Sequence, residues 1–287
     1  GYRRPALALY VVLWNPLLLL HHIANGHNDL LVGCLLALAF YLMLRDKCLW
    51  VIPVLVAATL MKYAPALLIP PALIYVVRCA GWRVAALGCL IGALMFVIVS
   101  APYLQDWRLL RLEDIRDNAT LIDNSLHSLL IHIYENFSRL LPALARFHDA
   151  VDAAIKGTLR LGLVLFFVVR MWRVWKDSSM EAVMRTSVLI MFALICVASS
   201  KFNAWYLGML LPPALLLEER YWLRRLVVLL TCSELLSLTF FKQAYMINYF
   251  AMIIVPAWII GRRVRREKAA GALTSGETSE RPLLNAS

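Results

Sequence analysis

Charged residues are scarce in this sequence. Only 16% of its 287 residues are Asp, Glu, Lys or Arg, whereas 62% are hydrophobic and the mean hydropathy is +0.71. This composition excludes an ordinary water-soluble domain and indicates an integral membrane protein.

The sequence also lacks the patterns of a metalloprotein or a disulfide-stabilised secreted protein. Its six cysteines show neither metal-ligand spacing nor a secreted disulfide pattern. No Asp-rich metal motif is present, so we expect no tightly held metal, and the need for a divalent cation stays open. No signal peptide is visible. Because the chain opens on Gly1 directly before an apolar run, we expect residues to be missing from its front.

Long apolar runs are abundant. A helix needs about 20 apolar residues to cross a bilayer core. Runs that approach this length once their flanks are included cover residues 6–20, 30–44, 84–99, 159–169, 188–198, 207–217, 226–241 and 247–260. The sequence therefore predicts an all-α, polytopic transmembrane helical bundle with about eight spans.

The basic residues are concentrated in short loops. If the chain alternates across the membrane, most of the 29 Lys and Arg fall on one side, which the positive-inside rule marks as cytoplasmic together with both ends of the chain. The net charge of +11 is thereby explained without a nucleic-acid partner. The predicted location is the bacterial cytoplasmic (inner) membrane. The loop residues are Arg3, Arg4, Arg45, Lys47, Arg78, Arg83, Arg170, Arg173, Lys176, Arg185, Arg220, Arg224, Arg225, Arg262, Arg263, Arg265, Arg266 and Lys268.

Alternation requires residues 51–77 to enter the membrane and return, because basic loops flank them at both ends. Lys62-Tyr63-Ala64-Pro65 lies at the middle. Pro65 disfavours helix at Ala64 and begins a new helix well. We therefore predict a short broken helical pair that holds Lys62 below the outer surface, facing protein or a cavity.

Two further segments differ from the spans. Residues 101–157 mix charges with leucines at helical spacing, which predicts two or three extracytoplasmic amphipathic helices roofing a lipid-accessible cleft. Residues 269–287 are rich in Gly, Ser, Thr and Glu, which predicts a disordered cytoplasmic tail after a membrane domain over residues 1–268.

A dense polar cluster lies between two apolar runs near the N-terminus. Polar, titratable groups at the mouth of a membrane segment are expensive to bury, so the cluster is a candidate functional site. Its members are His21, His22, Asn25, His27, Asn28 and Asp29. The alternatives are that Asn28 or Asp29 merely caps the next helix and that His21 and His22 lie at the headgroup level.

Other polar residues fall on the same predicted outer face. Lys62 and Lys201 stand there against the charge bias and suit a phosphate as point charges. The two lysines could instead be snorkelling or interfacial anchors. The other residues of this face also have structural alternatives. Trp205 and Tyr206 could form an aromatic belt, and Asn124 and Ser125 could cap a helix with His127 at the surface. Within the run 226–241, Glu234 reads as a structural partner of a neighbouring span.

The order of these motifs resembles that of the bacterial polyprenol-phosphate-mannose-dependent mannosyltransferases, which are multi-pass GT-C class glycosyltransferases. The resemblance covers about residues 14–206. It rests on Asn15-Pro16, Asn25-Gly26-His27-Asn28-Asp29, Lys62-Tyr63-Ala64-Pro65, Asn124-Ser125-Leu126 and Lys201-Phe202-Asn203-Ala204-Trp205-Tyr206.

The resemblance implies transfer of a hexose, most readily mannose, from a polyprenyl-phosphate-linked donor to an envelope glycolipid or glycan acceptor. It also implies that the principal catalytic carboxylate lies in a loop ahead of Gly1. The lipid-linked sugar is a co-substrate, and no other cofactor is expected.

The residue roles follow from the chemistry of the transfer. Glycosyl transfer passes through an oxocarbenium-like state and needs a carboxylate near the attacking hydroxyl and a cation near the departing phosphate. We assign Asp29 and His27 to catalysis and Lys62 and Lys201 to the donor phosphate. Substrate binding is assigned to Asn25, Asn28, Tyr63, Asn124, Ser125, Trp205 and Tyr206.

Two other functions stay open at this point. A secondary transporter or flippase would also place polar groups at broken helices, although it would usually show an internal repeat with matching breaks. A non-catalytic membrane scaffold would not need polar residues gathered on one face from four separate loops.

Overall fold

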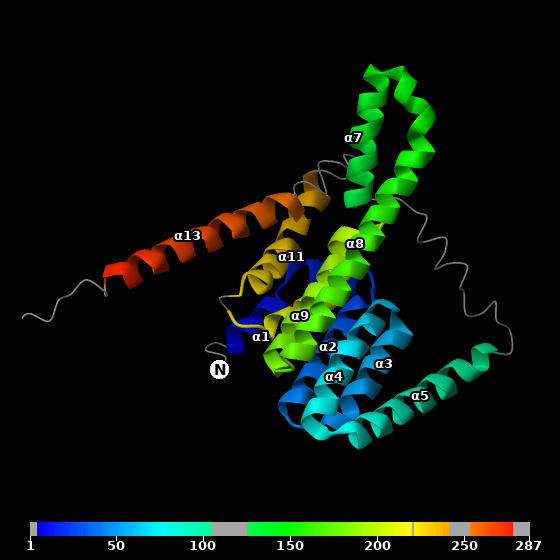
Figure 1. The fold of residues 1–287 in the computed structure, drawn as a ribbon, viewed down its shortest axis with the longest axis vertical. Coiled ribbons are helices and arrows are strands. Elements are labelled where there is room, and N and C mark those ends of the chain that lie inside the picture. Colours follow the sequence, from blue (N-terminus) through cyan, green and yellow to red (C-terminus); the bar gives the residue numbers. More distant parts are fainter. Residues whose placement is uncertain (1–4, 105–124, 220, 241–252, 278–287) are drawn as a thin grey trace, which may run out of the picture.

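The computed structural model describes residues 5–104, 125–219, 221–240 and 253–277. Within these ranges the regular structure is helical and contains no strand, as the sequence predicts (Figure 1). The core is a continuous cluster of Leu, Ile, Val, Ala, Met and Phe drawn from helices along the whole chain.

The first predicted span is broken. Helix α1 (Pro5–Leu13) is followed by a π-helical segment, η1 (Leu18–Ala24), and the two are bent by 60°. Buried Asn15 stabilises the bend, because its Oδ1 accepts from the backbone N–H of Leu17 and Leu18 and its Nδ2 donates to Thr231 Oγ1 at 2.8 Å. An apolar residue at this position would leave those N–H groups without this acceptor.

The broken pair predicted around Lys62 is confirmed. After α2 (Asp29–Leu44) and η2 (Cys48–Trp50), α3 (Val51–Met61) ends at Lys62, whose backbone is extended at φ −150° and ψ 137°. The 3-10 segment η3 (Ala64–Leu68) has Pro65 in its first turn and leads into α4 (Ile69–Ala80).

Within the described residues, fewer helices are long enough to span a membrane than the sequence predicts for the whole chain. Among the described helices, those long and apolar enough to cross a membrane are Trp82–Tyr103 in α5 (Trp82–Leu104) and Met180–Ala198, which joins α9 (Met180–Ala193) to η6 (Leu194–Ala198). The bent pair α1–η1 would make a third. Two other runs expected to span, residues 30–44 and 207–217, lie in shorter apolar helices, Asp29–Leu44 and Ala204–Leu215.

The segment predicted as an outer amphipathic layer is a helical hairpin where it is described. Helix α7 (Leu126–Leu140), the 3-10 segment η5 (Pro142–Phe147) and the start of α8 (His148–Lys176) project beyond the other helices (Figure 1). Helix is present where the leucine spacing predicts it. In this arrangement the hairpin points away from the bundle and does not lie flat across its end. Residues 105–124 are outside the described ranges.

The helices that position the site are packed tightly at glycines. Helix α2 lies along α10 (Leu207–Leu215), which follows the 3-10 turn η7 (Ala204–Tyr206). A Cβ at Gly33 would collide with the carbonyl oxygen of Gly208, and one at Gly208 would collide with the ring of His22. Small residues allow such close backbone approach between membrane helices.

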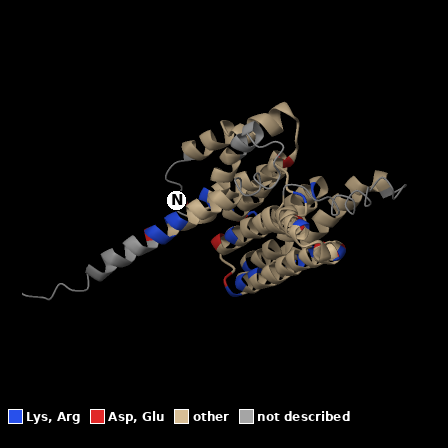
Figure 2. Ribbon diagram, turned by 90° about the horizontal axis from the view of Figure 1, so that it is seen from above, with Lys and Arg blue, Asp and Glu red and all other residues tan. Residues whose placement is uncertain are grey.

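Two helices complete the chain. Helix α11 (Trp222–Phe240) packs on α10, and α13 (Val255–Glu277) joins α11 through a 2.8 Å ion pair of Arg225 with Glu267. Basic residues line the described part of α13 (Figure 2). The disordered cytoplasmic tail over residues 269–287 stays a prediction.

The bundle has two distinct ends. Helix α2 starts at Asp29 and ends about 22 Å away beside Arg45 and Lys47. At that second end, the Arg78 guanidinium lies over the Trp175 ring at 5.0 Å, so α4 and α8 finish side by side. The basic residues of these loops therefore gather away from Asp29, as the charge pattern predicts.

Candidate functional site

Four segments that are distant in the sequence meet at the end of the bundle where α2 begins. They are the end of η1, the loop into α2, the break at Lys62 and the turn η7. The contacts that join them are an ion pair, a cation–aromatic contact and a stacked ring pair. Asp29, Lys62, Tyr206, His27 and Trp205 thus lie in one cluster.

Asp29 and Lys62 form the centre of this cluster. Lys62 Nζ lies 3.5 Å from Asp29 Oδ1, and the Lys62 side chain is 33% exposed whereas that of Asp29 is fully buried. Neither carboxylate oxygen of Asp29 receives a hydrogen bond among the described residues. A buried carboxylate is tolerated only when it is paired, so Lys62 and the N-terminus of α2 supply its compensating charge.

Lys62 also faces an aromatic ring. Its Nζ lies 5.5 Å from the centroid of the Tyr206 ring, and the Tyr206 hydroxyl accepts from Asn203 Nδ2 at 3.0 Å. Because Lys62 sits where α3 breaks, its ammonium is held between Asp29 and Tyr206 and remains one-third exposed. A lysine held in this way can receive an anion from the exposed side.

His27 and Trp205 form a flat aromatic surface beside the ion pair. Their rings are stacked at a centroid distance of 4.2 Å and an interplanar angle of 10°. His21 packs at 5.5 Å from Trp205 and 6.1 Å from His27. The turn that presents His27 depends on Gly26, whose φ of +69° is one that side-chain-bearing residues rarely adopt.

His22 joins η1 to the start of α2. Its Nδ1 lies 2.9 Å from the His27 carbonyl oxygen and 3.4 Å from the Leu30 backbone nitrogen. The shorter contact favours a proton on Nδ1 that is donated to His27. His21 and His22 are therefore buried elements of the site.

The remaining predicted site residues have varied environments. Tyr63, Asn25 and Asn28 are exposed, and Asn28 precedes α2 without a side-chain capping bond, so the capping alternative is wrong for Asn28. Lys201 lies in the loop before η7, and its backbone N–H donates to Ser199 Oγ. Its side chain forms no ion pair with a described carboxylate.

Ser125 has a structural role. Its Oγ accepts from the Ser128 backbone N–H at 3.1 Å, which caps α7, and donates to the Ser200 carbonyl at 2.6 Å. The capping alternative is confirmed for this residue. The second bond ties the hairpin to the loop that carries Lys201. Asn124 lies outside the described residues, as does the side chain of Glu234.

The hairpin holds a polar pair that no sequence pattern singled out. The alternative of a surface position for His127 is wrong, because His127 is buried. Its Nε2 lies 2.8 Å from Asp152 Oδ1, while Lys156 donates to Asp152 Oδ2 at 2.8 Å. Burial lowers the pKa of His127. Burial raises the pKa of Asp152, but its bonds to Lys156 and His127 outweigh this and lower it overall. The i, i+4 spacing of Asp152 and Lys156 was the available signal.

Within the described ranges, no group of three or more His, Cys, Asp or Glu side chains is arranged to hold a metal ion. The chemistry that this cluster can offer comes from a half-exposed ammonium, an imidazole stacked on an indole, and a buried carboxylate that fixes the ammonium.

Comparison with known proteins covers the N-terminal part of the chain. Residues 2–78 match the model of a family described as alpha-(1->6)-mannopyranosyltransferase, N-terminal domain. No curated protein and no solved structure matches the chain. The matched residues include His21, His22, His27, Asp29 and Lys62. The match covers less than half of the chain and supports a similarity of these residues to a mannosyltransferase family.

Proposed function

We propose that this protein transfers mannose from a polyprenyl-phosphate donor to a glycolipid or glycan acceptor of the cell envelope. The family match supports mannosyl transfer. The geometry that carries the donor assignment is the Lys62–Asp29 pair, in which the ammonium is exposed on one side and held 3.5 Å from a buried carboxylate on the other.

In the proposed reaction the acceptor hydroxyl oxygen forms a bond to the anomeric carbon, and the bond from that carbon to the phosphate oxygen breaks. Positive charge develops on the sugar ring and negative charge on the departing lipid phosphate. Lys62 stabilises that phosphate as a fixed cation in a place of low dielectric. The hydroxyl proton passes to a base.

The burial of Asp29 shapes the role that we propose for it. Its carboxylate is fully buried, and Lys62 stands 3.5 Å away. A base must reach the acceptor hydroxyl directly or through one water. We therefore propose that Asp29 positions Lys62, and that the stacked rings of His27 and Trp205 form the surface on which the sugar packs.

We further propose that the site faces the extracytoplasmic side of a multi-pass, GT-C-like membrane protein. The support is the separation of the Asp29 end of α2 from the basic loop that contains Arg45 and Lys47. By the positive-inside rule, that loop belongs in the cytoplasm. A polyprenyl phosphate would then approach Lys62 from the outer leaflet.

The direct test is activity of the purified full protein in proteoliposomes. Radiolabelled polyprenyl-phosphate-mannose should yield labelled envelope lipid or glycan with wild-type protein. Lys62→Ala should lower the rate by about 100-fold, the usual effect of removing one group that stabilises transition-state charge. The control is Lys47→Ala, which removes the same charge from the loop at the other end. Equal loss in both variants, or uptake of solute without transfer, would contradict the proposal and favour a transporter.

A further inference from the structure

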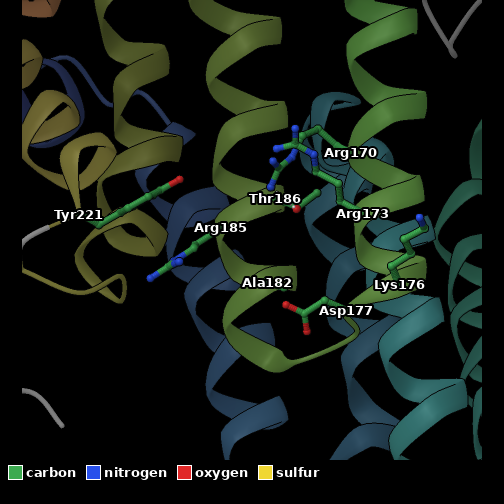
Figure 3. Close-up of a pocket in the computed structure, with 8 residues that line it drawn as sticks. All are labelled: Arg170, Arg173, Lys176, Asp177, Ala182, Arg185, Thr186 and Tyr221. Carbon is green, nitrogen blue, oxygen red and sulfur yellow. Dashed lines mark hydrogen bonds between the residues drawn. The ribbon is translucent and has the colours of Figure 1, made fainter. Parts of the chain in front are cut away.

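A second polar site lies at the end of the bundle away from Asp29. It is a cavity of about 420 Å³ between the end of α8, the first turns of α9 and the residue before α11. Figure 3 shows Arg170 and Thr186 pointing toward one another and Lys176 farther along α8, next to the loop that carries Asp177. The proposed mannosyl transfer makes no use of this cavity.

The charge lining this cavity is unbalanced. Arg170, Arg173 and Lys176 recur at intervals of three along α8 and form no ion pair with any carboxylate in the described part of the chain. A fourth cation, Arg185, is already paired with Glu181 and Glu218. Since like charges in a partly enclosed space repel one another, three unpaired cations here favour an anion.

Asp177 does not neutralise the three cations. Its Oδ1 accepts from the Ser179 backbone N–H at 3.0 Å, a bond within the α8–α9 loop, and that bond lowers the pKa of Asp177. The Asp177 carboxylate forms no ion pair with Arg170, Arg173 or Lys176. The cavity therefore keeps a net positive lining.

The hydrogen-bond donors of the cavity are partly unused. Arg170 donates from a terminal nitrogen to buried Thr186 Oγ1 at 2.6 Å, which fixes the guanidinium, while its Nε is buried without an acceptor in the described residues. Burial raises the pKa of the Tyr221 phenol, so the phenol stays protonated and can donate. The cavity therefore offers a fixed guanidinium and a phenol donor beside the cations of Arg173 and Lys176.

We propose that this cavity binds a phosphate-bearing anion, a phosphomonoester or diphosphate, between Arg170, Arg173 and Lys176. Guanidinium groups bind phosphate oxygens with two parallel hydrogen bonds, and lysine adds a point charge. The volume falls within the range of small-ligand pockets, which leaves room for a phosphate together with the group that it esterifies.

The surroundings favour the headgroup of an anionic phospholipid as the source of that phosphate. Trp172 and Trp175 flank the cations on α8 and are 60% and 56% exposed, and the Lys176 ammonium lies 4.9 Å from the Trp172 ring centroid. Exposed tryptophans are typical of the membrane interface, where basic pockets between helices bind lipid headgroups. A soluble phosphate compound would supply the same chemistry.

Binding can be measured independently of mannosyl transfer. The full protein is placed in nanodiscs of phosphatidylcholine containing a small fraction of phosphatidic acid, and retained phosphatidic acid is counted by native mass spectrometry. In a second arm, inorganic pyrophosphate is titrated calorimetrically into nanodiscs of phosphatidylcholine alone. Each arm compares wild type with Arg170→Gln/Arg173→Gln and with a control, Arg45→Gln/Arg83→Gln, which removes two positive charges from the same end outside the cavity.

We expect wild type and control to retain one phosphatidic acid and the cavity variant to retain about 10-fold less, because both guanidinium forks are gone. The protein could instead bind pyrophosphate and retain no phosphatidic acid. If the cavity variant then weakens pyrophosphate binding and the control does not, the result supports the site with a soluble phosphate compound as its ligand. If the double variant does not fold, Lys176→Gln should show a smaller loss in the same direction. Equal binding by wild type, cavity variants and control in both arms would overturn the proposal.

Discussion

The two ends of the helical bundle hold their charges in opposite ways. At one end, buried Asp29 and half-exposed Lys62 lie 3.5 Å apart and compensate one another. At the other end, Arg170, Arg173 and Lys176 line a cavity without a described carboxylate partner. A paired charge in a buried place can fix the position of a reactive group, whereas unpaired cations in a cavity favour an anion from outside.

The same contrast extends to the groups around the charges. The Lys62 end has a stacked imidazole and indole and a glycine-tight contact between α2 and α10. The cavity end has long arginine and lysine side chains on α8, the helix that also carries the exposed Trp172 and Trp175. The first arrangement suits fixed geometry during a reaction, and the second suits a bound headgroup that needs charge more than exact placement.

The largest effect is expected from Gly33→Ala. A methyl group at this position would meet the Gly208 carbonyl oxygen, which belongs to the backbone and cannot swing away. We expect destabilisation by about 1–3 kcal/mol, typical of overpacking, with loss of the Lys62 end before the cavity end. Thermal unfolding in detergent measures this. Gly162→Ala is the control because a Cβ there meets nothing within 4 Å; equal stability of both variants would contradict the tight contact.

A double-mutant cycle separates positioning by Asp29 from direct catalysis. If Asp29 acts through Lys62, Lys62→Ala should lower mannosyl transfer by about 100-fold, Asp29→Asn by about 10-fold, and the double variant no further than Lys62→Ala alone. Additive losses would show instead that Asp29 meets the substrate independently. Circular dichroism of each variant checks that the helices remain folded.

Acid should loosen the α7–α8 hairpin. The pKa of His127 is lowered by burial and that of Asp152 is lowered by its bonds, so the unfolded hairpin binds more protons than the folded one. Stability therefore falls as the pH drops below the ordinary pKa of histidine and falls further toward that of Asp152. Hydrogen exchange of α7 at neutral pH and in mild acid, expressed as protection relative to the intrinsic amide exchange rate at each pH, measures this. Equal or higher protection in acid would contradict the assignment.

The smallest effect is expected from Ser125→Ala. The variant removes the cap of α7 and the bond to the Ser200 carbonyl, which should cost about 1 kcal/mol locally. Hydrogen exchange at the start of α7 should accelerate, with little change in α2 or α10. Ser138→Ala, which removes a hydroxyl bonded to the Glu135 carbonyl nearer the end of α7, is the matched control.

The helical class and the break at Lys62 could be read from the sequence. Both follow from local causes, namely long apolar runs and a proline at position 65. The number of spans was harder to predict, because it depends on whether a bent helix pair counts as one span. The bend after Trp14 is stabilised by the bond of Asn15 to Thr231, 216 residues away in the chain, and no local pattern specifies that bond.

The candidate site shows the same division. Residue types alone marked His27, Asp29 and Lys62, because polar groups beside apolar runs are expensive to bury. Their roles could not be derived in the same way. Asp29 was predicted to act on the acceptor, but the burial of its carboxylate behind Lys62 is set by the packing of α2 against its neighbours.

By itself, the sequence determined a helical membrane protein whose basic loops lie apart from its polar motifs. Apolar runs form helices through local interactions, and the order of basic loops along the chain sets their side of the membrane. Only the tertiary structure decided that His27 stacks on Trp205, that Lys62 faces both Asp29 and Tyr206, and that three cations of α8 share a cavity with Thr186 and Tyr221. These contacts join residues far apart in the chain, and they exist because close helix packing leaves each side chain a single place to lie.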